Sequence, residues 1–277
     1  MTRRAAVLAA LLASACAAPP GAAPVAAPPS GAAGTADLLA ALRTWTVVDL
    51  TWPLDERVPY WPGLKYFPFE AWETARFEEV SAFSRAYRVP EHCGTHLDAP
   101  NHFAPGQASI DEVPPGRLFG PAVVFDISDR AAGDPDATLT AADVDAWEAL
   151  HGRVPEGAIA LLRTGWAARW GDPAAYRNFD GEGLLRFPSF GLDAARRLLV
   201  ERGCVGLGVD ALSVDLGRDG EFPVHRLGSG LGRWFAENLA NLDRLPPAGA
   251  VVVALPVPLR GGSGAQARVL AFLPPAR

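Results

Sequence analysis

Short runs of β-branched and apolar residues, each bounded by Gly, Pro or Asp, recur along the chain from residue 47 to residue 273. Runs of this length and composition are typical of β-strands. The predicted strands are Val47–Thr51, Ala82–Val89, Ala122–Ile127, Ala158–Arg163, Val205–Val209, Val251–Leu255 and Val269–Leu273.

Helical patterns separate some of these strands. Thr140 can cap a helix that runs through Leu150 and stops at Gly152, and residues Leu192–Arg202 form an amphipathic segment that ends at Gly203. A third helix is predicted over Leu231–Leu242, which would carry Glu237. Strands interleaved with helices indicate an α/β fold, and about 240 residues suit one large domain.

Three of the chain's five histidines and one carboxylate stand within the eleven residues 92–102. Imidazole and carboxylate groups are ligands that Zn²⁺ and Mn²⁺ accept. Gly94 and Pro100 disfavour a helix here, so we expect an extended segment. Side chains alternate along a strand, which would turn the even-numbered groups toward one side, with Pro100 bending the path before the last. These groups are His92, His96, Asp98 and His102.

A single buried histidine is more often a core residue satisfied by hydrogen bonds than a metal ligand. Four polar groups this close together would each need a partner if they were only structural, because an unpaired buried polar group costs a few kcal/mol. The cluster therefore predicts a metal site.

The segment resembles the metal-binding signature of the cyclase family, which includes bacterial kynurenine formamidases and isatin hydrolases. The matching pattern is His-x-Gly-Thr-His-x-Asp-x-Pro-x-His over residues 92–102. The family's remaining ligands are a later His and a Glu twelve residues on, and His225 and Glu237 have that separation. Further similarity lies in Asp49-Leu50-Thr51, Trp61-Pro62-Gly63, Thr164-Gly165-Trp166, Gly208-Val209-Asp210 and Arg260-Gly261-Gly262-Ser263-Gly264.

The resemblance implies one or two divalent ions, zinc or manganese, with Asp98 as the bridging carboxylate. It implies that His92, His96 and Asp98 hold one ion, and that His225 and Glu237 hold the second. A bound ion of this kind lowers the pKa of water and polarises a carbonyl. His102 would then be the general base and acid, since an imidazole transfers protons in both directions near neutral pH. The alternative makes His102 a hydrogen-bond partner of a ligand.

The activity implied is metal-dependent hydrolysis of an amide bond in a small aromatic substrate, with N-formylkynurenine as the main candidate. An isatin hydrolase-like activity on a cyclic amide or lactone is the alternative. A cyclisation or dehydration, and a metal-binding lipoprotein without turnover, are further possibilities. Phe103 and Trp61 are the aromatic residues expected near the substrate, although core packing explains most of the eight tryptophans.

The resemblance also implies a mixed sheet of the swivelling β/β/α type, assembled as a homodimer or larger homo-oligomer. The predicted domain spans residues 37–277, after a signal peptide over 1–15 and an Ala/Pro/Gly-rich tether over 16–36. Residues Ala13-Ser14-Ala15-Cys16 resemble a lipobox, so we expect an exported, periplasmic protein, lipid-anchored through Cys16. Ordinary signal-peptide cleavage is the alternative. The apolar run is shorter than the ~20 residues that span a bilayer.

The formal net charge is -6, and it becomes -8 without Arg3 and Arg4, the two charged residues of the first fifteen. An acidic protein of this kind lacks the basic surface that binds nucleic acid, so we expect a small-molecule substrate and no nucleic-acid partner. Cys93 and Cys204 are expected to be free, buried thiols rather than a disulfide. A nucleophilic role for Cys93 is the weaker alternative to metal-dependent hydrolysis.

Overall fold

All seven predicted strands form, and six of them lie in one mixed sheet. The computed structural model describes residues 37, 39–40, 42–63 and 66–275. The chain divides into two units, residues 1–40 and 41–277, and every strand named here lies in the second. The predicted signal peptide, the tether and Cys16 lie outside the described residues. The strands of the large sheet are β1 (Thr46–Asp49), β4 (His96–Asp98), β5 (Phe119–Asp126), β7 (Ile159–Arg163), β9 (Gly206–Val209), β10 (Trp234–Glu237), β11 (Ala248–Pro256) and β12 (Gly264–Leu273).

The large sheet closes on itself. Its order is β1-β12-β11-β5-β7-β9-β10-β4, and β4 also pairs with β12, so seven strands form a barrel to which β1 is added along β12. Strands β5, β7, β9 and β10 run parallel to one another, and the other pairings of the sheet are antiparallel. The α/β class and the mixed sheet are confirmed. Closure into a barrel was not predicted, because it depends on pairing between β4 and the distant β12.

Successive side chains of the barrel strands enter two different cores. Val124 and Leu161 belong to the apolar cluster that draws on strands all round the barrel, and this cluster fills its interior. Phe125 and Leu162, one position along, belong to a second cluster that includes residues of the covering helices. This period of two is the direct result of the strand geometry, and both faces of the central strands are buried.

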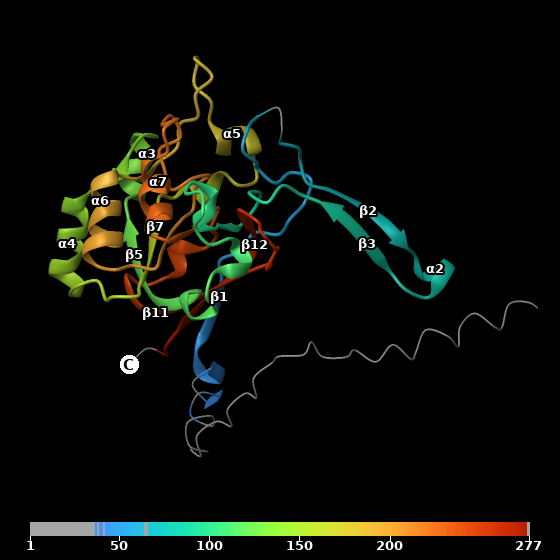
Figure 1. The fold of residues 1–277 in the computed structure, drawn as a ribbon, viewed down its shortest axis with the longest axis horizontal. Helices are drawn as coiled ribbons and strands as arrows, with labels where there is room; N and C mark the ends of the chain where they lie inside the picture. Colours follow the sequence, from blue (N-terminus) through green and yellow to red (C-terminus); the bar gives the residue numbers. More distant parts are fainter. Residues whose placement is uncertain (1–36, 38, 41, 64–65, 276–277) are drawn as a thin grey trace, which may run out of the picture. The chain divides into compact units, whose positions relative to one another are not determined.

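Helices cover the outer face of the parallel strands (Figure 1). The predicted helix after Thr140 is confirmed: the Thr140 hydroxyl accepts a hydrogen bond from Asp143 N, and Gly152 ends the helix with φ 86°. The predicted segment 192–202 is also helical, with its second half in π-helical form. The helices are α3 (Ser128–Gly133), α4 (Ala141–His151), α5 (Pro173–Arg177), α6 (Leu192–Arg196) and α7 (Pro223–Gly230).

The third predicted helix, over Leu231–Leu242, is wrong. Residues Trp234–Glu237 form strand β10, which pairs with β4 on one side and β9 on the other. Gly232 precedes the strand with φ 68°, a conformation that breaks a helix. Hydrogen bonds to two distant strands therefore override the helical spacing of the apolar residues in this segment.

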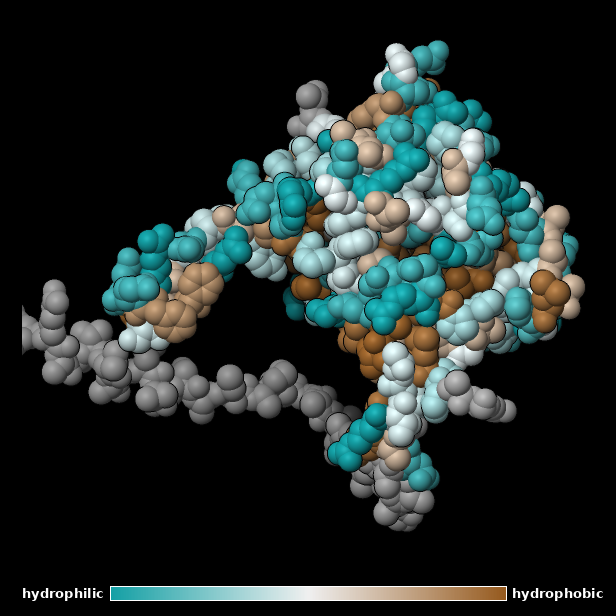
Figure 2. Space-filling view, turned by 180° about the vertical axis from the view of Figure 1, so that it is seen from behind, coloured by the Kyte–Doolittle hydropathy of each residue, from teal (hydrophilic) through white to brown (hydrophobic). Residues whose placement is uncertain are grey.

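A two-stranded hairpin extends away from the barrel (Figure 1). It consists of β2 (Glu70–Ala75), the short helix α2 (Phe77–Val80) and β3 (Ser84–Arg88). Large apolar side chains remain exposed on it, and apolar surface is visible among its hydrophilic side chains (Figure 2). A second pair, β6 (Thr138–Leu139) and β8 (Ser189–Phe190), joins the start of α4 to that of α6. Among the described residues, no helix combines the length and apolarity needed to cross a membrane.

An ion pair links α4 to the end of the π-helical segment and predicts a pH dependence of stability. Arg202 donates to both carboxylate oxygens of Glu148, at 2.7 and 2.9 Å, and both side chains are largely buried. The hydrogen bond from Arg202 lowers the pKa of Glu148 to about 2, against the opposing effect of burial and with help from the Val154 N–H. Because the folded-state pKa is depressed, this stabilisation is present above the ordinary pKa of 4.5 and is lost as pH falls toward 2.

We expect Glu148→Gln to lower the free energy of unfolding by about 1–3 kcal/mol at pH 7. The difference from the unmodified protein should shrink from pH 4.5 downward and vanish near pH 2. Urea unfolding at several pH values measures both. Glu201→Gln is the control, since that carboxylate is 48% exposed and should have little effect. A difference that is constant with pH would contradict the ion-pair explanation.

Candidate metal centre

Three polar side chains of the site lie on the paired strands β4 and β10. Leu97 and Ala236 lie in the barrel-interior cluster, so their neighbours along each strand face the outer side. The register pairs Glu237 with His96, and Asp98 lies on the same face two residues on. His96, Asp98 and Glu237 are all at most 5% exposed. Backbone pairing thus brings three polar groups to one face of the barrel wall.

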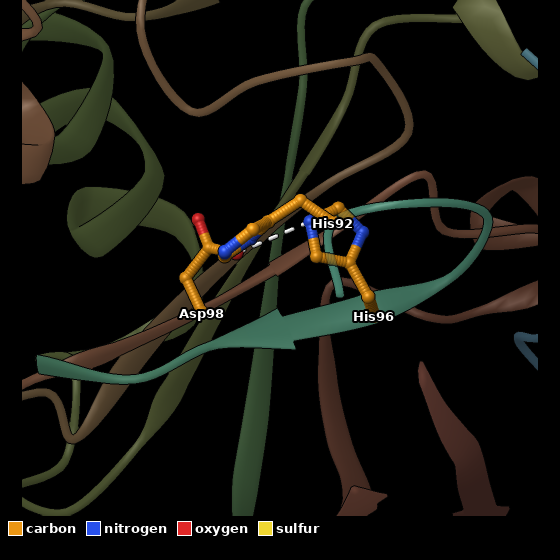
Figure 3. A group of neighbouring side chains, drawn as sticks. All are labelled: His92, His96 and Asp98. Carbon is orange, nitrogen blue, oxygen red and sulfur yellow. Dashed lines mark hydrogen bonds and ion pairs between the residues drawn. The ribbon is translucent and has the colours of Figure 1, made fainter. Parts of the chain in front are cut away.

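His92 reaches the same place from a turn. The expected extended segment is a strand only over His96–Asp98, and Gly94 turns the chain just before it with φ 68°. Glycine accepts this φ more readily than other residues, and a Cβ atom there would lie 2.5 Å from Leu54 Cδ2, so the Leu54 side chain would have to move. The His92, His96 and Asp98 side chains turn toward one another above β4 (Figure 3).

His225 comes from the first turn of α7. Phe222 precedes this helix with φ 53°, and Pro223 occupies its first turn, where no backbone donor is needed. Asp215 holds the helix start, because its carboxylate accepts hydrogen bonds from Val224 N at 2.6 Å and His225 N at 3.0 Å. The same carboxylate accepts from His225 Nδ1 at 2.6 Å, which orients the ring.

The five predicted ligands converge in two groups of three that share Asp98. The first group is His92, His96 and Asp98, and the second is Asp98, His225 and Glu237. Within each group, one ligand atom from every residue lies within 4.8 Å of the others. A carboxylate can serve both groups because each of its two oxygens can contact a different ion.

Each of the three imidazoles has one nitrogen bonded to the protein and the other turned toward the carboxylates. The first nitrogens are His92 Nε2, 2.8 Å from Ser263 Oγ, His96 Nδ1, 2.8 Å from Gly94 O, and His225 Nδ1, bonded to Asp215. The second nitrogens are His92 Nδ1, 2.6 Å from Asp98 Oδ1, His225 Nε2, 2.9 Å from Asp98 Oδ2, and His96 Nε2. Metal-binding histidines are commonly oriented through their other nitrogen in this way.

These residues fit a divalent cation. His96 Nε2 is buried without a hydrogen-bond partner, although it lies 3.1 Å from Asp98 Oδ1 and 3.5 Å from Glu237 Oε2. Burial would raise the pKa of Asp98, but the nearby His92 and His96 and the hydrogen bonds from His225 and His92 hold that pKa well below its ordinary value. Two buried carboxylates therefore need positive charge beside them, and a divalent ion held by the ring nitrogens would supply it.

His102 stands beside these groups without belonging to either. Pro100 starts a short 3₁₀ turn that ends at His102, so the path bends after β4 as expected. The His102 ring stacks on that of His92, with centroids 3.9 Å apart. Burial lowers the pKa of His102 to about 4 against the pull of Asp98, so the ring is neutral at pH 7 and can accept a proton.

A cavity of about 310 Å³ opens onto both groups of ligands. The two aromatic residues predicted near a substrate, Trp61 and Phe103, both line it. Tyr66 and Phe222 also line it, and no motif in the sequence indicated them. The Phe103 ring contacts that of His225 at 4.5 Å and that of Phe222 at 5.2 Å. The walls are thus suited to a flat aromatic molecule.

The two cysteines among the described residues are free and buried, as expected. Burial raises the pKa of the Cys93 thiol to about 12 and that of Cys204 to about 12. A thiol with so high a pKa is neutral at pH 7 and a poor nucleophile. Cys93 therefore belongs to the packing beneath the site.

Comparison with known proteins identifies the family. A family described as "Putative cyclase" matches residues 48–216, which is more than half of the chain. The chain belongs to the cyclase family. Its cyclase signature lies within the matched residues, whereas His225 and Glu237 follow them and are placed at the site by the fold.

Individual cyclase-family relatives differ in their similarity to this chain. An isatin hydrolase of Roseibium aggregatum is 39% identical over 194 residues, which cover 67% of this chain and 73% of that protein. A kynurenine formamidase of Polaromonas naphthalenivorans is 29% identical over 248 residues, 86% of this chain and 96% of the relative. The crystal structure of an isatin hydrolase bound to the product analogue thioisatinate superposes with a TM-score of 0.82, at 32% identity, covering 87% of this chain and 98% of the other.

Proposed function

We propose that this cyclase-family protein is a metal-dependent amidohydrolase that opens the ring of isatin or a similar aromatic cyclic amide. The observation that carries the proposal is the aromatic cavity over the two ligand groups, in a chain 39% identical to an isatin hydrolase. Water adds to the amide carbonyl of the ring, the bond between that carbon and the nitrogen breaks, and the nitrogen receives a proton.

Hydrolysis of N-formylkynurenine, the main expectation from the sequence, becomes the second candidate. It is supported by 29% identity to a kynurenine formamidase over most of both chains. Both reactions break a carbon–nitrogen bond next to an aromatic ring, so the same cavity could hold either substrate. The higher identity and the structural similarity favour the cyclic amide.

The five ligand side chains would hold one or two divalent ions, and their all-imidazole and carboxylate chemistry suits zinc or manganese. When bound, such an ion lowers the pKa of water and polarises the substrate carbonyl. His102, neutral at pH 7, takes a proton from the attacking water and returns one to the departing nitrogen. Trp61, Phe103 and their aromatic neighbours hold the ring of the substrate and exclude water.

The test is a side-by-side assay of isatin, N-formylkynurenine and simple lactones with Mn²⁺ or Zn²⁺ added to metal-free protein. We expect isatin hydrolysis with a kcat/KM at least about 10-fold above that for N-formylkynurenine, as one differing substrate feature commonly gives. Faster hydrolysis of N-formylkynurenine would favour the formamidase instead. Hydrolysis of no substrate with either metal would contradict an amidohydrolase.

Two proposals concern the protein outside this site. The lipobox-like segment ending at Cys16 supports export and attachment to a membrane by a lipid, and the mass of the mature N-terminal peptide tests this. An unmodified cytoplasmic N-terminus would contradict it.

The family resemblance supports a homodimer or larger assembly. Light scattering measures the mass of the protein in solution, and a monomer mass would contradict this assembly.

A further inference from the structure

Asn238 directly follows the ligand Glu237 and leaves the strand in a left-handed conformation, with φ 57°. Asn adopts this conformation more readily than most residues. Its backbone N–H donates to Ala211 O at 3.0 Å, and its carbonyl accepts from Thr95 Oγ1 at 2.7 Å. The residue is 2% exposed, so its side-chain amide must find partners inside the protein.

The side-chain amide of Asn238 meets the carbonyl that orients a second ligand. Asn238 Nδ2 donates to Gly94 O at 2.9 Å, and His96 Nδ1 donates to the same oxygen at 2.8 Å. A carbonyl oxygen only accepts, so His96 Nδ1 carries a proton, and in the neutral ring the lone pair is on Nε2, where a metal ion would bind. Nε2 is the nitrogen that is buried without a partner and faces both carboxylates.

Tyr176, on α5, contacts the oxygen of that amide. Its hydroxyl lies 3.1 Å from Asn238 Oδ1 and 3.0 Å from Asp210 O, and both of these oxygens are acceptors. The ring is fully buried, and burial holds the pKa of Tyr176 well above its ordinary value, so the hydroxyl stays a donor. Gly94 O only accepts, so Nδ2 faces it, and Oδ1 is turned toward the single hydroxyl proton that Tyr176 shares between Oδ1 and Asp210 O.

We propose that Asn238 and Tyr176 are positioning residues for the metal centre. They hold the Gly94 carbonyl in place, and through it the tautomer and direction of the His96 ring. Neither side chain is among the five ligands. The inference rests on the proposed function, because it takes His96 as a ligand. It adds two residues on which metal affinity depends: Asn238, which follows β10, and Tyr176, which lies on α5.

Asn238→Gly removes the amide without straining the backbone, since glycine accepts φ 57°. Asn241→Gly is its matched control: Asn241 has φ 56°, and its Nδ2 donates to Asp49 O at 2.7 Å, away from the ligands. Tyr176→Phe removes only the hydroxyl. The measurements are the dissociation constant of Mn²⁺ on each metal-free protein, the visible absorption spectrum with Co²⁺, and urea unfolding without metal.

We expect Asn238→Gly to weaken Mn²⁺ binding by about 10- to 100-fold, the usual effect of removing a hydrogen-bond partner that orients a metal ligand. Tyr176→Phe should weaken it by about 3- to 10-fold, the equivalent of one hydrogen bond. Both should change the Co²⁺ spectrum. Asn241→Gly should leave the dissociation constant and the spectrum unchanged, even where it lowers stability as much as Asn238→Gly does.

An unchanged dissociation constant and spectrum in Asn238→Gly would overturn the inference, as would equal losses of affinity in both glycine variants. His96→Ala separates this failure from failure of the proposed function. If His96→Ala loses Mn²⁺ and Asn238→Gly does not, only the positioning role is wrong. If His96→Ala binds Mn²⁺ as tightly as the unmodified protein, the ligand assignment itself is wrong.

Discussion

Asp98→Asn is expected to remove bound metal and to lower kcat/KM by about 10³-fold or more, because a bound ion contributes several kcal/mol to such a reaction. Asp98 is the one residue that belongs to both ligand groups. Its two oxygens lie 2.6 Å from His92 Nδ1 and 2.9 Å from His225 Nε2. The substitution keeps the shape of the side chain and removes its negative charge, so the loss falls on the ions rather than on packing.

Metal content per chain and kcat/KM for isatin, measured on the same preparation, check this prediction. Asp210→Asn is the control, since Asp210 is also buried but accepts hydrogen bonds from Thr164 and Gly165 and lies in neither ligand group. It should keep its metal whatever its effect on stability. Full metal content together with full activity in Asp98→Asn would contradict the shared-carboxylate centre.

His102→Ala is expected to lower kcat by about 10²- to 10⁴-fold, the usual contribution of a general acid–base group. Its metal content should stay unchanged, because His102 lies in neither ligand group although its ring stacks on that of His92. This combination of lost turnover and retained metal separates a proton-transfer role from a ligand role. The measurements are kcat and metal content per chain.

His151→Ala is the matched control for that experiment. His151 ends α4 and packs against Trp147, with ring centroids 4.9 Å apart, far in the sequence from the ligands. It should change neither kcat nor metal content. If His102→Ala lost its metal, the residue would be a structural support of His92, as the alternative reading of the sequence holds.

The first ligand group, His92, His96 and Asp98, is predicted from local sequence, but its backbone differs from the predicted extended segment. The prediction is that His92, His96 and Asp98 alternate along one strand and so point to one side. In the structure, only the last two lie on β4. His92 comes from the turn at Gly94, whose positive φ brings the ring back over the strand. Closely spaced metal-binding residue types therefore predict that the side chains converge, but they do not predict the backbone conformation that brings them together.

The second half could not be placed from local patterns. Glu237 was expected on a helix and lies on β10, because pairing with β4 and β9 decides the conformation. His225 lies on α7, which was not predicted because its sequence contains Gly228 and Gly230, both poor helix formers. Gly228 is needed for packing, since a Cβ there would lie 2.4 Å from Phe235 Cζ.

The groups that orient the histidine ligands are harder to predict from the sequence than the ligands themselves. Asp215, Ser263 and the Gly94 carbonyl each hold one histidine, and the first and last of these lie ten and two residues from it. Ser263 lies 171 residues from His92 along the chain, and closure of the barrel between β4 and β12 brings the two together. The contact of Ser263 with His92 is therefore a consequence of topology, which local propensity does not encode.

The most direct measurement is a crystal structure of the protein grown with Mn²⁺, with anomalous scattering used to locate the ions. The result we predict is anomalous density among His92, His96, Asp98, His225 and Glu237, with Asp98 beside each ion found. Density only at surface carboxylates, with none among these five side chains, would contradict the central claim that they form a metal centre.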